Sequence, residues 1–313
     1  MPQMTGSAVR VVDPVLTEVA RGYRNPAYIG SALFPRVPVG VRGGRIIEFG
    51  KESFRLYNTA RAPGSKVVIA QFGYSGQPYA LEDHSISGMV PIEHLEEASQ
   101  TPGIDMGSGA VQFARDIILL RQEYDQATIA RNPASYAASN KVTLSGTSQW
   151  SDYSGTSDPI ADIEDFIDVI RSKTGMRPNT LELGAPVFKA VKNHPKVIER
   201  IKYTGRESAT PELLASLLGL QRVVVGDAIY TDADGNTQDV WGKDAVLAFT
   251  NTAPLSSMGV PSYGYTYGLR GYPLSEPAYY DGGHKSWLYP TSDSVSPVIA
   301  GADAGFLIVN AVA

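Results

Sequence analysis

The sequence predicts an α+β protein organised around one long helix, for two reasons. The first is a helical pattern over residues 108–131, where apolar side chains recur at alternating four- and three-residue steps: Phe113, Ile117, Leu120, Tyr124 and Ala127. The second is that strand patterns flank this helix and a stretch of alternating helices and strands follows it. We call the helix the spine. At 1.5 Å per residue it spans about 36 Å, enough to brace several elements lying across it.

Local signals set the ends and the faces of the spine. Ser108 is the expected N-cap after Pro102 and Gly103, and Asn132-Pro133 stops the helix. The apolar stripe is the expected buried face. The polar residues that fall largely outside it are Arg115, Arg121, Glu123 and Gln126.

Length and composition bound the class of protein. The 313 residues are enough for a sizeable core in one large or two smaller folding units. Because there is no cysteine, disulfides, thiolate metal sites and cysteine nucleophiles are excluded. No signal-peptide pattern occurs and no apolar run approaches about 18 residues, so we expect a soluble intracellular protein without a membrane-spanning segment.

Charge is distributed unevenly along the chain. The net charge of −5 argues mildly against a dedicated nucleic-acid binder. Through Arg61 the chain carries a net +5, which leaves −10 for the remainder. The two parts are electrostatically complementary, although a merely solvated basic surface is the alternative.

Residues 1–42 form an expected arm. Pro14, Pro26, Pro35 and Pro38 prevent one long helix or a central strand, yet the segment is too apolar for a solvated linker. We therefore expect an extended arm that lies against other surfaces, with another subunit as a candidate to supply them.

Residues 43–85 form an expected long hairpin. Strand alternation occurs at residues 45–57 and 66–74, and the turn-rich tip between them contains Pro63-Gly64. Because an isolated two-stranded hairpin is marginal in water, one this long needs a surface to lie on. A neighbouring molecule is one candidate.

Residues 135–255 alternate between helical and strand patterns and predict a compact mixed domain. Its clearest helix has Asp158 as N-cap and Pro159 as first residue, and it ends before Gly175. The other expected helices span residues 186–193, 195–203 and 210–219, and the expected strands span 180–184, 222–230 and 240–249.

The domain that contains the spine is expected to be discontinuous in sequence. Residues 86–134 hold the spine, and residues 256–313 are expected to return to it. The apolar run at residues 306–312 is strand-like and too apolar for a free tail, so we expect it to pair beside the spine.

No constellation in the sequence predicts a catalytic, cofactor-binding or metal-binding residue. DADGN at residues 232–236 is expected to be a hairpin turn, since an EF-hand calcium loop needs its glycine at about the sixth position. Helix capping explains Ser108, the nearest thing to a nucleophile. Four histidines share no ligand spacing, namely His84, His94, His194 and His284. An acidic helical face is expected to be solvated, namely Asp162, Glu164, Asp165 and Asp168.

Taken together, these segments resemble the major capsid proteins of tailed bacteriophages, which have the Hong Kong 97-type fold. The resemblance covers nearly the whole chain. ARGYRNPAYIGSALFPRVPVG is similar to the N-terminal arm of one branch of that family, and GGRIIEFGKESFRLYNTARAPGS to its extended loop. SDPIADIEDFIDVIRSKTGMRPNTLELGAPVFKAVKNHPKVIERIKY is similar to the start of its axial domain, and the spine belongs to its peripheral domain.

The resemblance implies a structural protein rather than an enzyme. Copies would assemble into pentamers and hexamers of an icosahedral shell around double-stranded DNA, in a virion capsid assembled in the host cytoplasm. Candidate partners are scaffolding, portal and decoration proteins and DNA contacted non-specifically at the inner surface, with no cofactor and no membrane. No motif places the Lys–Asn crosslink of some relatives on Lys51 or Lys66, and no long charged helical leader indicates a fused scaffolding segment.

Two alternatives stay open, a non-viral encapsulating or binding homo-oligomer and a hydrolase with a carboxylate site in residues 158–255. The basic arm has three interpretations as well. We expect it to engage the acidic remainder of a neighbouring subunit, while packaged DNA or solvent are the alternatives. Its arginines are Arg10, Arg21, Arg24, Arg36, Arg42 and Arg45.

Overall fold

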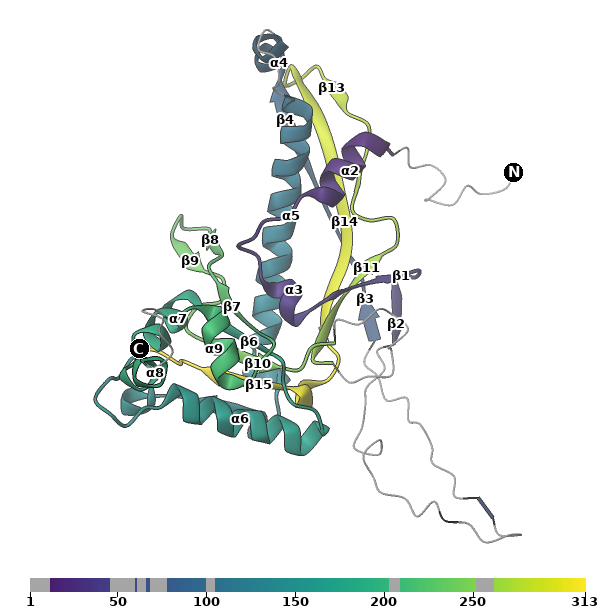
Figure 1. Cartoon of the computed structure of the whole chain (residues 1–313). Coiled ribbons are helices and arrows are strands. Elements are labelled where there is room, and N and C mark those ends of the chain that lie inside the picture. The colour runs from purple at the N-terminus through teal and green to yellow at the C-terminus, as the bar shows by residue number, and fades with distance from the viewer. Residues whose placement is uncertain are drawn as a thin grey trace.

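The chain is elongated, with a long helix and a long sheet at its centre and a compact domain beside one end (Figure 1). The computed structural model describes residues 12–45, 60, 66–67, 78–99, 105–202, 209–251 and 262–313. Most of the expected hairpin at residues 43–85 and its tip therefore lies outside the described residues. Among the helices of the described ranges, none is long and apolar enough to cross a bilayer.

A six-stranded sheet, which we call the spine sheet, runs along the length of the spine. Its central strand β14 pairs antiparallel with β4 over the whole length of β4 and with β11, β12 and β13 on its other side. Strand β1 adds to β11 in parallel. The strands are β1 (Arg36–Val39), β4 (Glu82–Pro91), β11 (Gly264–Leu269), β12 (Leu274–Ser275), β13 (Tyr279–Asp281) and β14 (Ser286–Ile299).

The spine itself is α5 (Met106–Ala130), which confirms the predicted helix but not its predicted cap. Asp105 is the N-cap: its carboxylate accepts from the backbone N–H of Gly107 at 3.0 Å and of Ser108 at 3.1 Å. The hydroxyl of Ser108 donates to the same carboxylate. A carboxylate at the helix start satisfies free N–H groups and favours the positive end of the helix dipole, so the helix begins earlier than Ser108.

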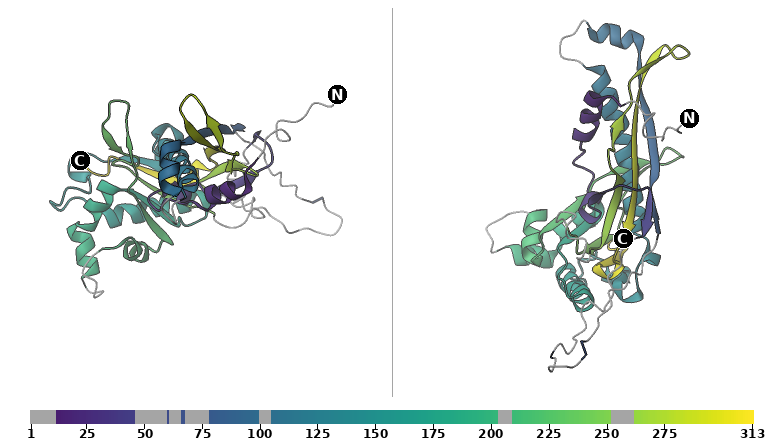
Figure 2. Two further views of the ribbon diagram at one scale, coloured as in Figure 1. Left: turned by 90° about the horizontal axis from the view of Figure 1, so that it is seen from above. Right: turned by 90° about the vertical axis from the view of Figure 1, so that its right-hand side faces the viewer.

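The buried face of α5 is not the predicted apolar stripe. The helix lies on one face of the spine sheet (Figure 2), and its buried residues are Gly107, Ala110, Val111, Ala114, Arg115, Ile118, Glu123, Gln126, Ala127 and Ala130. Phe113 is 65 % exposed, and of the predicted stripe only Ala127 is fully buried. The reason is close packing: a Cβ on Gly88 of β4 would lie 2.4 Å from the carbonyl oxygen of Ala110. Helix and sheet approach so closely that small residues, rather than large apolar ones, occupy the contact.

The mixed domain contains a five-stranded sheet in the order β5–β15–β10–β6–β7. Its strands are β5 (Lys141–Thr143), β6 (Thr180–Gly184), β7 (Arg222–Gly226), β10 (Ala245–Ala248) and β15 (Gly305–Val309). Its helices are α6 (Pro159–Thr174), α7 (Ala185–Lys192), α8 (Pro195–Ile201) and α9 (Pro211–Leu218). Short 3₁₀ turns lie at Pro133–Ser135, Ala138–Asn140, Gly146–Ser148 and Ala302–Ala304.

Both faces of this sheet are buried. Leu247 and Ile308 point into an apolar core beneath the helices α6 to α9. Their neighbours Val246 and Leu307 point the other way, into a second core shared with the lower end of the spine and containing Trp241. Burial on two faces explains why these strands are apolar throughout instead of alternating.

The prediction that residues 306–312 return to the spine is wrong. β15 pairs antiparallel with β10 and parallel with β5 in the mixed domain. The strand beside the spine is β14, which completes the discontinuous spine domain. The reason is again burial, because a run without polar alternation fits a sheet covered on both sides and not the spine sheet, which has exposed residues on one face.

Local signals in the mixed domain give the expected helices and most of the strands. Asp158 caps α6 by accepting from the N–H groups of Ile160 and Ala161, and Gly175 ends the helix in the left-handed region at φ 68°. The expected strand at 222–230 is divided into β7 and β8 (Ile229–Thr231), because the chain turns around Trp241: a Cβ on Gly226 would lie 2.4 Å from that ring. The expected turn at residues 232–236 joins β8 to β9 (Thr237–Asp239). The expected strand at 240–249 shortens to β10, since Gly242 adopts φ 57°.

Candidate functional site

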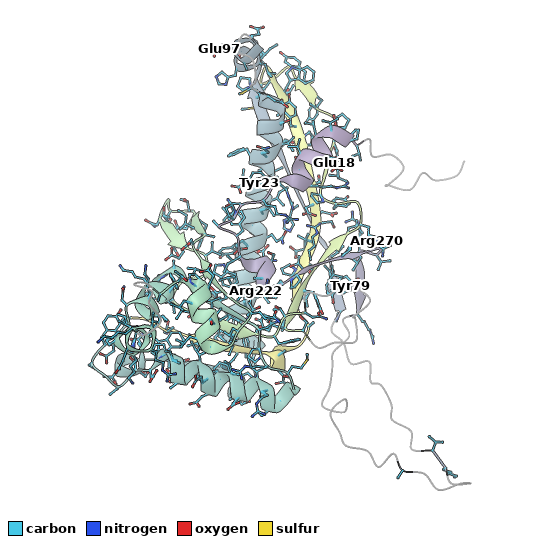
Figure 3. All side chains as sticks on the ribbon, viewed as in Figure 1. Glu18, Tyr23, Tyr79, Glu97, Arg222 and Arg270 are labelled. Carbon is cyan, nitrogen blue, oxygen red and sulfur yellow. The ribbon has the colours of Figure 1, made fainter. Side chains whose placement is uncertain are left out.

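The described part of the arm folds onto its own chain. It contains α2 (Pro14–Gly22), α3 (Gly30–Leu33) and β1, and it continues into β2 (Gly43–Arg45), which pairs with β3 (Pro78–Ala80). Figure 3 shows α2 and α3 against the spine. The prolines act as expected, since Pro14 is the first residue of a short helix and Pro38 lies in the edge strand β1. The expectation of an extended arm is therefore wrong for residues 14–22 and 30–33, which are helical, while residues 36–39 are extended.

Polar contacts hold α2 in place. The Asp13 carboxylate accepts from the N–H groups of Val15 and Leu16, at 2.9 and 3.0 Å, and so caps the helix. Ser275 of β12 donates its N–H to the hydroxyl of Thr17 at 3.0 Å and accepts from the N–H of Asp13 at 3.0 Å. The helix is thus fixed to the backbone of the spine sheet by the N–H of Asp13 and the hydroxyl of Thr17.

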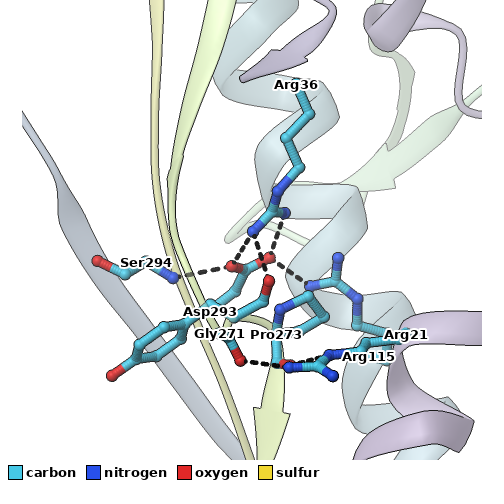
Figure 4. A network of polar contacts seen from close by, with 8 residues as sticks. Arg21, Arg36, Arg115, Gly271, Pro273, Asp293 and Ser294 are labelled. Atoms are coloured by element: carbon cyan, nitrogen blue, oxygen red, sulfur yellow. Dashed lines mark hydrogen bonds and ion pairs between the residues drawn. The ribbon is translucent and has the colours of Figure 1, made fainter. Parts of the chain in front are cut away.

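One buried carboxylate joins the arm, the spine and β14 (Figure 4). Asp293 accepts a bidentate pair from the guanidinium of Arg36, at 2.7 and 2.8 Å, and a third bond from Nη1 of Arg115 at 2.7 Å. The backbone N–H of Ser294 donates to it at 2.9 Å. Arg36 belongs to β1 and Arg115 to α5, so three elements meet on one side chain.

Electrostatics keep this group charged despite its burial. Burial by itself raises the pKa of Asp293, but the hydrogen bonds and charges of Arg36 and Arg115 outweigh it and hold the pKa below its usual value. Burial lowers the pKa of Arg115, which Asp293 opposes and the neighbouring Arg36 and Arg24 reinforce. We call the ion cluster of Arg36, Arg115 and Asp293 the lock. Its members depend on one another, because Asp293 or Arg115 without its partner would be a buried unpaired charge.

Three arginines of the arm contact groups of their own subunit, while the expected engagement of a neighbouring subunit stays a prediction. Arg36 pairs with Asp293, and Arg42 pairs with Asp83 of β4. Arg21 donates to the carbonyl oxygens of Gly271 and Pro273, at 2.7 and 3.3 Å. Arg10 lies outside the described residues. A cavity of about 320 Å³ between the arm and the spine is lined by three arginines of the arm, Arg21, Arg24 and Arg36.

A second carboxylate fixes α3. Glu123 of α5 accepts from the N–H groups of Ile29 and Gly30, at 2.9 and 2.8 Å, and from Nε1 of Trp241 at 2.7 Å. Burial raises its pKa, although these hydrogen bonds oppose the rise. A Cβ on Gly30 would lie 2.0 Å from Oε1 of Gln126, so only glycine allows this approach. Glu123 thereby connects the arm, the spine and the mixed domain.

The spine is joined to the mixed domain by charged groups as well. Arg131, which follows α5, donates to the carboxylate of Asp244 at 2.7 Å and to the carbonyl oxygen of Val240 at 2.9 Å. Glu182 of β6 lies fully buried on the same side of the sheet. Burial raises its pKa well above the usual value.

Several of the residues considered for chemistry are engaged in structural contacts. Asp162 accepts from Nε1 of Trp150 at 2.9 Å, Asp168 pairs with Arg171, and Glu164 pairs with Arg200. His194 caps α8, and His284 contacts Asp281 in an exposed turn. In the ranges that the structure describes, no three of the histidines and carboxylates come together as a metal site.

The spine laid on a long sheet, the mixed domain at one end and the arm folded back define a class, the Hong Kong 97-type capsid fold. The capsid protein of cyanophage P-SCSP1u shares the fold, with a TM-score of 0.57 at 11 % identity over 99 % of this chain and 92 % of that one. An encapsulin complex from Synechococcus elongatus PCC 7942 shares it as well, with a TM-score of 0.56 at 13 % identity over 92 % of this chain and 89 % of that one.

Closer similarity comes from sequence. A family model described as phage major capsid protein E matches residues 135–262. The major capsid protein of Burkholderia phage BcepMu is 40 % identical over 96 % of this chain and 97 % of its own, and that of Pseudomonas phage JBD67 is 30 % identical over the same shares. A phage-related protein from Bordetella bronchiseptica RB50 has a TM-score of 0.83 at 44 % identity, covering 97 % of this chain and 98 % of its own. The chain belongs to the family of phage major capsid proteins.

Sequence reasoning missed the lock around Asp293 and the role of Glu123. One signal was available: Arg115 stands four residues after Val111 and three before Ile118, in the small-residue stripe that the spine does bury. A charge in such a stripe requires a buried partner. Its partner could not have been named, because Asp293 lies 178 residues away.

Proposed function

We propose that this protein is the building block of a phage capsid, forming pentamers and hexamers that close into an icosahedral shell around double-stranded DNA. The observation that carries the proposal is identity of 40 % to a phage major capsid protein over 96 % of the chain. The shape of the subunit supports it, since an elongated body with a domain at one end presents contact surfaces far apart.

We further propose a structural role without catalysis or a cofactor. Three of the side chains considered for catalysis make structural contacts instead: Asp162 accepts a hydrogen bond from Trp150, His194 caps α8 and Asp168 pairs with Arg171. The partners would be other copies, DNA at the inner surface, and scaffolding, portal and decoration proteins, with assembly in the host cytoplasm and no contact with a membrane. The arm would be residues 1–42, the extended loop 43–85, the peripheral domain 86–134 with most of 256–313, and the axial domain 135–255 with β15.

The test is assembly of the purified full-length protein, followed by electron microscopy and sedimentation velocity. Closed shells or rings of subunits are the expected result. A monodisperse monomer over a wide range of protein and salt concentrations would refute the proposal. Shells that take up a protein cargo but no DNA would favour the non-viral encapsulating alternative.

A further inference from the structure

The cavity of about 320 Å³ between the arm and the spine has a lining rich in arginine. Its volume is at the lower end of the range of small-molecule sites, which is about 300–1,000 Å³. The arm supplies Arg21, Arg24 and Arg36 to the lining, and α5 supplies Arg115. Because a guanidinium group presents several N–H donors and a fixed charge, four of them around one cavity make it a candidate site for an anion.

The lock lies at this cavity and leaves positive charge uncompensated. Arg36 and Arg115 share the single carboxylate of Asp293 (Figure 4). Arg24 lies close enough to repel Arg115 electrostatically, as Arg36 does. Within the described residues, Arg24 forms no ion pair of its own. Three guanidinium groups thus gather around one carboxylate.

Other carboxylates close to the cavity are held by neutral donors or lie at its edge. Glu123 lines the cavity, but both of its oxygens accept hydrogen bonds from the N–H groups at the start of α3 and the indole of Trp241. Asp116 of α5 accepts from a hydroxyl and a side-chain amide of the arm, at 3.3 and 3.0 Å. Glu18 pairs with Arg21 in solvent. In the part of the chain that the structure describes, none of these carboxylates pairs with Arg24.

Two buried polar atoms on the spine side of the cavity lack a partner among the described residues. Arg115 is 5 % exposed, and its Nε makes no hydrogen bond there. Oε1 of Gln122, which also lines the cavity, is buried and has none either. Half a turn of the Gln122 amide would present its N–H donors at the same place. Because unpaired buried polar groups are unfavourable, these two indicate a ligand that the side chains of the cavity do not replace.

The chemistry and depth of the cavity define the ligand. Arginine binds the oxygens of phosphate through paired N–H donors, and a phosphate ion accepts several such bonds at once. Arg115 is reached only through the cavity between the arm and the spine, because its side chain is nearly fully buried. A small ion fits this path, whereas a nucleic-acid duplex is too wide to bring a phosphate to it.

We propose that this cavity is a binding site for a small phosphate ion, held between Arg24 of the arm and Arg115 of the spine. A ligand that contacts both elements stabilises the arm in its folded position, because the two must stay together for it to bind. All residues of the site belong to one subunit. The proposal therefore goes beyond the assembly of shells and does not depend on it.

The first experiment is isothermal titration calorimetry of the unassembled full-length subunit with inorganic phosphate in a chloride buffer. We expect one site per subunit. Arg24→Gln should weaken binding at least about tenfold, because it removes a charged donor from the ligand. Arg24 is exposed, so circular dichroism of this variant should be unchanged. Arg171→Gln removes an exposed arginine of α6 and is the matched control, which should bind phosphate like wild type.

A second variant supplies the negative charge from the protein itself. Gln122→Glu keeps the size of the side chain and places a carboxylate at the cavity. We expect it to raise the melting temperature of the phosphate-free subunit by about 2 °C or more and to weaken phosphate binding at least about tenfold. Gln112→Glu at an exposed position of the same helix is the control and should change neither quantity.

Three results would overturn the proposal. The first is no phosphate binding by wild type, and the second is equal affinity in wild type and Arg24→Gln. The third is that a duplex oligonucleotide binds in an Arg24-dependent manner while inorganic phosphate does not, which would assign the arginine to nucleic acid. A lower melting temperature for Gln122→Glu than for Gln112→Glu would likewise show that the cavity does not favour negative charge. Since every measurement uses the unassembled subunit, none of these results bears on the proposed function.

Discussion

The helices α5 and α6 are buried by opposite means. α6 buries the isoleucines of its apolar stripe, Ile160, Ile163, Ile167 and Ile170, against the core of the mixed domain. α5 buries small residues together with Arg115, Glu123 and Gln126, and leaves Phe113 in solvent. Burial of apolar surface holds α6 in place. Close packing of small residues against the sheet, together with hydrogen bonds of charged side chains, holds α5.

The two helices differ in how strictly they fix the positions of the elements that pack against them. Apolar burial is non-directional and tolerates changes of shape, so α6 needs only residues of suitable size. A buried carboxylate with fixed donors accepts one arrangement of its partners. Glu123 of α5 holds α3 to the spine, and Arg115 of α5 shares the carboxylate of Asp293 in β14 with Arg36 of β1. The polar face of α5 therefore helps to determine where the arm lies. The comparison can be tested by conservative changes on each side.

The largest effect is expected from Asp293→Asn. The amide keeps the shape of the side chain but removes the charge that compensates Arg36 and Arg115. Loss of one partner from a buried ion cluster costs about 3–5 kcal/mol. Urea unfolding of the unassembled subunit measures this, with Asp168→Asn on the exposed face of α6 as the control. A loss no greater than that of the control would show that the cluster contributes little.

The next effect concerns pH and Glu182. Burial raises the pKa of this group in the folded state above its ordinary value of 4.5. Above about pH 4.5 the unfolded chain releases the proton while the folded chain retains it, so this group makes the subunit less stable as pH rises towards the folded pKa. Glu182→Gln cannot titrate, so the difference in unfolding free energy between this variant and wild type should move in favour of the variant as pH rises above about 4.5.

The measurement for Glu182 is the free energy of unfolding from about pH 5 to about pH 8. Arg131, Glu123 and Asp244 influence the same group electrostatically and are present in both proteins, so the difference between the two curves isolates Glu182. The exposed Glu199→Gln is the control and should leave the slope unchanged. Parallel curves for wild type and Glu182→Gln would mean that Glu182 is ionised in the folded protein.

A smaller effect is expected from Ile167→Val in the apolar core. The change removes one methylene group and should cost about 1 kcal/mol. Together with Asp293→Asn it tests the comparison directly, because both substitutions are conservative and both side chains are fully buried. A larger loss at Ile167 than at Asp293 would reverse the assignment of specificity to the polar face.

The sequence predicted elements whose causes are local and missed arrangements whose causes are distant. Both ends of α6 were predicted, since Asp158, Pro159 and Gly175 act on adjacent backbone. The pairing of β15 was missed because its neighbour β10 lies about sixty residues earlier in the chain, and the lock between Arg36 and Asp293 spans 257 residues. The buried face of α5 does not follow from the apolar stripe, because close packing of helix and sheet selects small residues over large apolar ones.

The smallest effect is expected from Phe113→Asp. This change distinguishes the buried face that the apolar stripe predicts from the buried face that the structure has. The periodic stripe places Phe113 in the core, and a charge there would prevent folding. The structure leaves this ring 65 % exposed, and a surface substitution away from caps and ion pairs changes stability by about 0.5 kcal/mol at most. The matched variant is Ala114→Asp at the next residue, which is fully buried against the spine sheet and should fail to fold. Thermal melting of the two unassembled subunits decides between the faces. A large loss at Phe113 with tolerance at Ala114 would mean that α5 lies on the sheet by its apolar stripe after all.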